Sequence, residues 1–106
     1  MSEVAEHATA IARDFKRAFA HLSDGNADAA AAACREGLAN FPDSIDLLTL
    51  LGASLNAQRL ADSALEPLHR ALRLAPGFAR AHEETGRSLL ILKRLDEAIS
   101  CFEEAL

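Results

Sequence analysis

The chain has 106 residues, of which 50% are hydrophobic and 25% are charged, and its formal net charge is −5. This length and composition are typical of one globular domain. The balance of 11 basic and 16 acidic residues argues against a nucleic-acid or anionic-membrane surface, because both need clustered lysine and arginine.

The N-terminal segment does not have the features of a targeting signal. MSEVAEHATAIARDFKR has no basic start and carries acidic residues among its apolar ones. No apolar run in the chain is long enough to span a membrane. The only cysteines are Cys34 and Cys101. We therefore expect a reduced, cytoplasmic protein.

The first two predicted helices cover residues 3–23 and 27–40, and a turn at residues 24–26 separates them. Ser2 is the expected N-cap of the first helix, and alanine dominates the second. The apolar stripe that we expect to face the core in the first helix comprises Val4, Ile11, Phe15, Ala18, Phe19 and Leu22.

The next two helices are predicted over residues 45–58 and 61–74, after a proline stop in FPDS at residues 41–44. Leu48, Leu51 and Leu55 recur at helical spacing and form one apolar face. Pro67 lies inside the fourth helix, where it removes the backbone donor for the carbonyl of Ser63, so we expect a slight bend.

The last two helices are predicted over residues 79–92 and 95–106, after a matching break in APGF at residues 75–78. Leu95, Ile99, Phe102 and Leu106 give the sixth helix an apolar face with no later element to cover it. We expect this C-terminal face to be open.

The three helical pairs form an internal repeat with a period of about 34 residues. Pro42 falls on Pro76, and Gly52 falls on Gly86. Agreement of many residue types at one offset indicates a repeat array. Three further sets share this offset: Asp28, Asp62 and Asp96; Ala30, Ala64 and Ala98; and Leu38, Leu72 and Leu106.

These spacings resemble the tetratricopeptide repeat family, a helix–turn–helix unit with small and large residues at fixed positions. The resemblance covers residues 11–106 and implies an all-α, right-handed superhelix with repeats at about 11–44, 45–78 and 79–106. Residues 1–10 would be an N-terminal extension of the first helix, and the whole chain one domain. The matching residues of the second repeat are Leu48, Leu51, Gly52, Leu55, Ala64, Leu68, Ala71 and Pro76.

The first helix departs from the family pattern. A gapless alignment puts Asp14, Arg17 and His21 at positions that the family normally buries. We expect the helix to rotate so that its apolar stripe packs inward and these three polar residues face water. In the third repeat His82 replaces a large residue, and we expect it to be packed and partly buried.

The resemblance also implies a binding surface. In this family the first helices of successive repeats line a concave groove that holds an extended peptide or a partner helix. Within that groove, Asn56 is suited to bond a peptide backbone and Arg87 to pair with a carboxylate. The candidate peptide- or protein-binding residues are Asp46, Thr49, Ala53, Asn56, Arg80, Glu83, Arg87 and Leu90.

One well-known subgroup of the family grips C-terminal carboxylates with a clamp of lysine, asparagine and arginine. That clamp would need basic or amide residues where Phe15, Phe19 and Glu84 stand, and only Arg80 fits it. We therefore do not expect this clamp. Glu83 and Glu84 would repel an acidic tail.

No catalytic, metal-binding or cofactor-binding pattern is present. HEETG at residues 82–86 lacks the second histidine of a zinc-protease helix, and the four histidines have no metal-ligand spacing. Cys34 and Cys101 lie two repeats apart, too far for a disulfide, and Cys34 is expected to be buried. We therefore expect no cofactor, no metal and no enzymatic activity of the chain itself.

The favoured interpretation is a protein-interaction scaffold that binds a peptide or partner protein in the concave groove. An alternative is the N-terminal segment of a larger enzyme, since similar repeats precede sulfotransferase and glycosyltransferase domains. In that case the array would present substrate or mediate oligomerisation. A further alternative is homo-oligomerisation through the uncovered C-terminal face.

Overall fold

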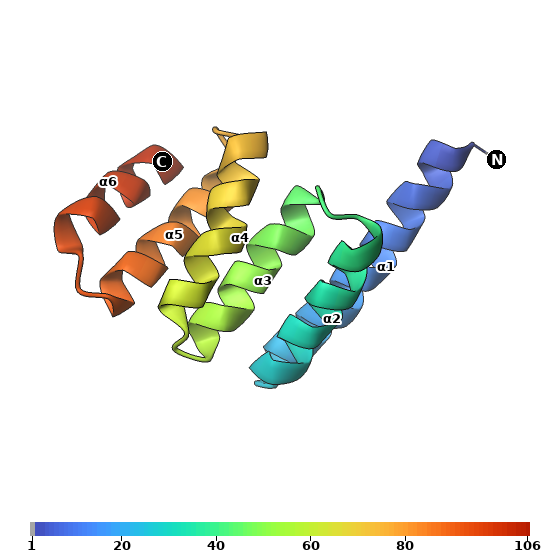
Figure 1. The fold of residues 1–106 in the computed structure, drawn as a ribbon, viewed down its shortest axis with the longest axis horizontal. Helices are drawn as coiled ribbons and strands as arrows, with labels where there is room; N and C mark the ends of the chain where they lie inside the picture. Colours follow the sequence, from blue (N-terminus) through green and yellow to red (C-terminus); the bar gives the residue numbers. More distant parts are fainter. Residues whose placement is uncertain (1) are drawn as a thin grey trace.

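The computed structural model describes residues 2–106 and contains six α-helices and no strand in that range. The helices follow one another across the molecule, with the two termini at opposite ends (Figure 1). Their bounds are α1 Glu3–Ser23, α2 Ala27–Asn40, α3 Ile45–Ala57, α4 Ala61–Leu74, α5 Ala79–Ile91 and α6 Leu95–Ala105.

All six predicted helices are confirmed, and α3, α5 and α6 each end one residue earlier than predicted. The N-termini of α1, α2 and α3 are capped by Ser2, Asn26 and Ser44. Each cap residue's side-chain oxygen accepts from the backbone N–H three residues later and so satisfies a donor that the helix leaves unpaired.

The helices form an array of stacked pairs that measures 48 × 28 × 20 Å. Each helix packs on its neighbours in the sequence. In addition, α1 contacts α3 and α3 contacts α5, whereas within residues 2–106 no contact joins α2 to α4 or α4 to α6. The first helices of the pairs are therefore closer together than the second helices, so that α1, α3 and α5 form the inner layer of a curved array and α2, α4 and α6 the outer layer.

The helix crossings depend on small residues. A Cβ added at Gly86 would lie 2.7 Å from Cε1 of Phe102, and one added at Gly52 would overlap the side chain of Leu68. Leu68 is fully buried, so it has no space into which to move. The small positions predicted from the sequence therefore set how closely each first helix approaches its partner.

The expected orientation of α1 is right in part: Ala18 is buried, and Phe15 and Leu22 pack against the core. We expected Asp14, Arg17 and His21 to face water, but Asp14 is 7% exposed and His21 is half-buried. Only Arg17 lies on the surface, where its guanidinium donates to the carboxylate of Glu36 at 2.9 Å.

The helix crossing explains why α1 does not rotate. Ala18 is fully buried at the position that Gly52 and Gly86 occupy one and two repeats later. A rotation would force a phenylalanine into this narrow crossing, at a cost of roughly 1–3 kcal/mol. As a result, Val4 and Phe19 of the expected core stripe are 77% and 47% exposed.

The turn inside each helical pair uses the left-handed backbone conformation. Gly25, Arg59 and Lys93 have φ values of 80°, 63° and 63°, and they occupy the same position in successive repeats. Glycine adopts this conformation without a Cβ penalty, whereas arginine and lysine do not. The repeat therefore keeps its turn geometry even where the sequence does not favour it.

Several local predictions can be compared with the structure. Cys34 is fully buried and His82 is partly buried, as expected, and the His82 ring lies 2.7 Å from the carbonyl of Pro76. Helix α4 continues through Pro67, and the expected bend there stays a prediction. At the C-terminus Leu95 and Ile99 are 59% and 56% exposed, which confirms an open apolar face on α6. In the part of the chain described, no helix has the length and apolar character needed to cross a bilayer.

Candidate binding groove

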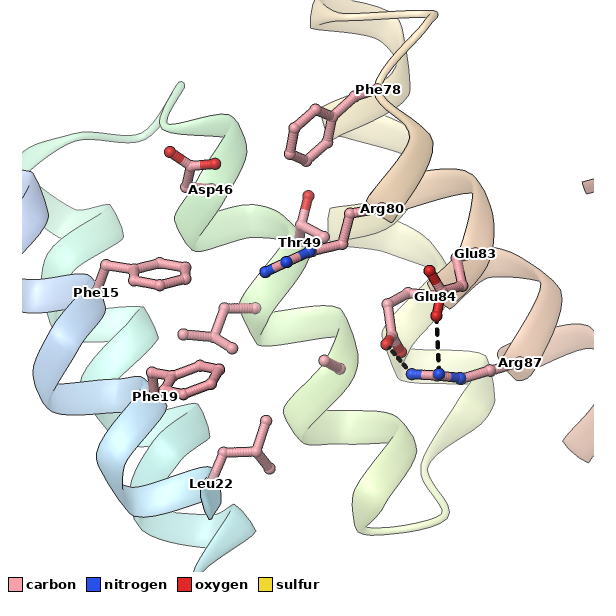
Figure 2. A pocket seen from close by; sticks show the side chains of 12 residues that line it. Phe15, Phe19, Leu22, Asp46, Thr49, Phe78, Arg80, Glu83, Glu84 and Arg87 are labelled. Atoms are coloured by element: carbon pink, nitrogen blue, oxygen red, sulfur yellow. Dashed lines mark hydrogen bonds and ion pairs between the residues drawn. The ribbon is translucent and has the colours of Figure 1, made fainter. Parts of the chain in front are cut away.

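Two adjoining pockets lie along the inner layer of helices, over α3 and between α1 and α5. Their volumes are about 320 Å³ and 440 Å³, and they share Leu22, Ala53, Glu84 and Arg87. Phe15, Phe19 and Leu22 project from α1 on one side, and Glu83, Glu84 and Arg87 project from α5 on the other (Figure 2). We call the two pockets together the concave groove.

All eight candidate binding residues line the concave groove. Asp46, Thr49, Arg80 and Glu83 line the first pocket, Asn56 and Leu90 line the second, and Ala53 and Arg87 line both. The register of the repeats therefore places the candidate residues on one continuous surface. Their position is established, and their role in binding stays a prediction.

Two of the candidates are engaged within the chain and nearly inaccessible. The Thr49 hydroxyl donates to the carbonyl of Ile45 at 2.8 Å, and this threonine is 2% exposed. The Asn56 amide donates to the carbonyl of Glu84 at 3.0 Å and accepts from the Ser88 hydroxyl at 2.8 Å. Both side chains thus lie in the floor of the groove, and Asn56 links α3 to α5 beneath it.

The charged residues of α5 form a compact cluster. Arg87 donates to the Glu83 carboxylate at 2.8 Å and to the Glu84 carboxylate at 2.5 Å, as the dashed lines in Figure 2 show. Glu84 is 6% exposed and lies away from bulk water. Its carboxylate is held there by Arg87 and by the Asn56 amide. Arg87, expected to bind a partner's carboxylate, is therefore already paired with two carboxylates of its own helix.

Two charges in the first pocket have no such partner. Within residues 2–106, neither Arg80 nor Asp46 forms an ion pair. The Arg80 guanidinium extends toward the middle of the pocket, and Asp46 lies nearer the α1 side (Figure 2). These two side chains are available to charged or polar groups of a ligand.

The candidate binding residues predicted from the sequence do not include the α1 side of the groove. Phe15, Phe19 and Leu22 line it, and they lie one repeat before the candidates Thr49, Ala53 and Asn56. The same offset that identifies the later residues would therefore have found these three. Their apolar character instead favoured the core and outweighed the register.

The pKa of both cysteine thiols is raised. Burial raises the pKa of the Cys34 thiol to about 12, although the Ser54 hydroxyl and Arg35 lower it in part. The pKa of Cys101 is raised first by burial and then by two nearby carboxylates. No group of three or more histidine, cysteine, aspartate or glutamate side chains in residues 2–106 is arranged to hold a metal ion.

Solved structures with the same fold include two TPR domains. The chain superposes on the first TPR domain of human RPAP3 with a TM-score of 0.86 at 19% identity, over 91% of this chain and 76% of that one. The second TPR of Spaghetti (RPAP3), bound to the HSP90 peptide SRMEEVD, gives a TM-score of 0.86 at 17% identity, over 98% and 96% of the two chains.

A third similar structure is a mutant of the O-GlcNAc transferase of Thermobaculum terrenum. It gives a TM-score of 0.88 at 26% identity and covers 100% of this chain. The chain spans only 20% of that transferase's length. A search of curated proteins finds no match.

A family model described as tetratricopeptide repeat matches residues 49–106, which is more than half of the chain. The match covers all but the first four residues of the second repeat and the whole of the third, and the stacked pairs of α1–α6 extend the same architecture to the first. The chain belongs to the tetratricopeptide repeat family.

Proposed function

We propose that the chain is a protein-interaction scaffold and that the concave groove binds a peptide or a segment of a partner protein. The observation that carries this proposal is the continuity of the groove, to which all three first helices contribute. Phe19, which lines the groove, is 47% exposed and offers apolar area to a ligand.

The physical basis of binding would be a rigid, partly apolar surface with few free charges. Phe15 and Phe19 stack with ring centroids 6.0 Å apart and offer apolar area on α1. The bonds of Asn56 and Arg87 hold the floor and the α5 side in place before any ligand arrives. A preformed surface loses little conformational entropy on binding, which favours affinity.

The chemistry of the groove disfavours a strongly acidic peptide. The neighbour that binds SRMEEVD takes a segment with three carboxylate side chains. Here Phe15, Phe19 and Glu84 stand where a carboxylate clamp would need basic or amide groups, and Glu83 adds another negative charge beside Glu84. We propose that an apolar side chain occupies the α1 side and that Arg80 contacts a single acidic or carbonyl group.

A random peptide library displayed on phage tests this function. Peptides selected on the wild-type protein are measured against Ala53→Arg, which places a long charged side chain where the two pockets join. Ala39→Arg is the matched control, since Ala39 is exposed on α2 and lines neither pocket of the concave groove. We expect a class of peptides that Ala53→Arg no longer binds and Ala39→Arg still binds. If every selected peptide binds both variants equally, the concave groove is not the binding site.

A second candidate function is supported by the transferase neighbour. That protein is an O-GlcNAc transferase, and this whole chain is similar to a fifth of its length at 26% identity. The array would then serve substrate presentation or oligomerisation in a larger enzyme. Sequencing the gene beyond the codon for Leu106 tests this: an open frame leading into a catalytic domain supports it, and a stop codon contradicts it.

A further inference from the structure

The outer face of the array carries a second groove, separate from the concave one. It lies between α2 and α4, has a volume of about 430 Å³ and shares no residue with the concave groove. Its floor is formed by the edges of Leu48, Leu51 and Leu55 of α3, which are only 4%, 8% and 3% exposed, with Pro67 at the α4 side. We call it the outer groove.

The rim of the outer groove is basic. Arg35 stands on the α2 side, and Arg70 and Arg73 stand on the α4 side, with Glu66 as the only acidic residue that lines it. Arg70 is paired with Asp43 at 2.8 Å, but neither Arg35 nor Arg73 forms an ion pair within residues 2–106. Arg35 and Arg73 thus place positive charge on both sides of the floor, in a chain whose net charge is −5.

Pro67 interrupts the backbone hydrogen bonds of α4 beside the outer groove. Pro67 has no N–H, so the carbonyl of Ser63 receives no bond from the residue four positions later. Ser63 lines the same groove.

We propose that the outer groove docks an acidic segment of a partner protein, with apolar side chains on the leucine floor and carboxylates at Arg35 and Arg73. Two separated guanidinium groups select a segment that carries acidic residues on both sides of an apolar one. A free phosphate would gain nothing from the leucine floor. A nucleic acid would meet only three arginines on a protein of negative net charge, which makes it a weaker candidate.

The double variant Arg35→Gln/Arg73→Gln tests the proposal, because these two side chains form no ion pair whose loss would unfold the protein. Its matched control is Arg59→Gln/Arg80→Gln, which removes two charges from the concave groove instead. The probes are individual peptides from the phage-displayed random library, synthesised and measured by fluorescence anisotropy. Circular dichroism melting checks that both double variants are folded.

We expect a class of acidic, leucine- or isoleucine-containing peptides whose dissociation constant rises about tenfold for Arg35→Gln/Arg73→Gln and stays the same for the control. Their affinity should fall as sodium chloride is added. Should the Gln variant fail to fold, Arg35→Lys/Arg73→Lys keeps the charges and should retain most of the binding, while Arg73→Gln alone should weaken it.

Three results would overturn the proposal. The first is a library that yields no acidic peptide sensitive to the outer-groove variants. The second is an acidic peptide class that is lost with Arg59→Gln/Arg80→Gln, which would place it in the concave groove. The third is self-association in sedimentation experiments that Arg35→Gln/Arg73→Gln abolishes, because the occupant would then be a second copy of this chain. The binding of each peptide to Ala53→Arg is measured separately. The concave groove is therefore tested even if no peptide binds in the outer groove.

Discussion

Asn56 and Glu84 join two successive repeats beneath the concave groove. The side-chain amide of Asn56, on α3, donates to the backbone carbonyl of Glu84 at 3.0 Å and to its carboxylate at 3.3 Å. Both residues are buried, at 7% and 6% exposure. An asparagine that the sequence suggests as a ligand contact is therefore first a link between repeats, and its loss would affect the shape of the groove before it affected any ligand.

Replacing Asn56 by alanine should destabilise the fold by about 1–3 kcal/mol, because the Glu84 carboxylate and the Ser88 hydroxyl lose a buried partner. Asn40→Ala is the matched control, since Asn40 is exposed at the end of α2. Urea unfolding followed by circular dichroism measures both. Equal free energies of unfolding for the two variants would show that the Asn56–Glu84 link contributes nothing to stability.

Gly52→Ala should destabilise the protein by about 1–3 kcal/mol, because the added Cβ overlaps the buried Leu68. Gly77→Ala is the control: a Cβ there meets nothing within 4 Å and the backbone has an ordinary φ. It should be neutral or stabilising by about 0.4–1 kcal/mol. The double variant Gly52→Ala/Leu68→Ala should lose less stability than the sum of the losses of the two single variants, because the shorter side chain at position 68 no longer overlaps the added Cβ. Strict additivity in thermal melts would disprove the steric explanation.

Lys93→Gly should raise stability by about 1 kcal/mol, because lysine adopts φ 63° at this turn and glycine does so without a Cβ penalty. The matched control is Lys93→Ala, which removes the same side chain but keeps the Cβ and should bring no such gain. Thermal melting of the three proteins at one concentration decides the question. A Lys93→Gly protein no more stable than Lys93→Ala would mean that the left-handed turn carries no cost here.

The two thiols should differ in reactivity. Burial raises the pKa of Cys34 to about 12, so almost no thiolate forms at neutral pH, whereas Cys101 is only partly buried. The thiolate is the reactive form, so a disulfide reagent such as Ellman's should modify Cys101 first, at a rate that increases with pH. Cys34 should react only as the protein unfolds in urea. The variants Cys34→Ser and Cys101→Ser assign the two phases, and rapid labelling of Cys34 in native Cys101→Ser would contradict the buried position.

Most of the fold can be predicted from the sequence because the same pattern of helices and turns occurs in successive repeats. The constant offset between repeats places Pro42 with Pro76 and Gly52 with Gly86, and each copy supports the helix bounds read from the other. Caps such as Ser44 then fix where a helix begins. The positions of the eight candidate residues along the groove follow from the same register, since they depend on spacing and not on side-chain contacts.

The first repeat is harder to predict because two signals conflict there. The apolar stripe through Phe15 and Phe19 suggests that α1 turns these residues inward, whereas the register assigns Asp14 to a buried position. The crossing at Ala18 decides in favour of the register, because the narrow space between the helices admits only a small side chain. Packing of this kind depends on distances between helices, which a hydrophobic pattern does not contain.

Not all the hydrogen-bond and ion-pair partners of the charged groove residues can be predicted from the sequence. Arg87 and Glu83 are four residues apart and their pairing follows helical spacing, but the contact of Glu84 with Asn56 spans 28 residues and two helices. Which arginines remain unpaired, as Arg80 does, depends on all such contacts together. This is why the positions of the candidate residues can be predicted from the register, while the prediction for Arg87 overlooks its internal carboxylate partners.

Chemical-shift mapping tests the central claim, binding in the concave groove, most directly. The ¹⁵N-labelled protein is titrated with a selected peptide whose binding Ala53→Arg abolishes. The largest amide shift changes should fall on the inner helices α1, α3 and α5, around Phe19, Ala53 and Arg87, with α2, α4 and α6 nearly unchanged. Shifts concentrated on the outer helices, or a selection that yields no peptide sensitive to Ala53→Arg, would contradict it.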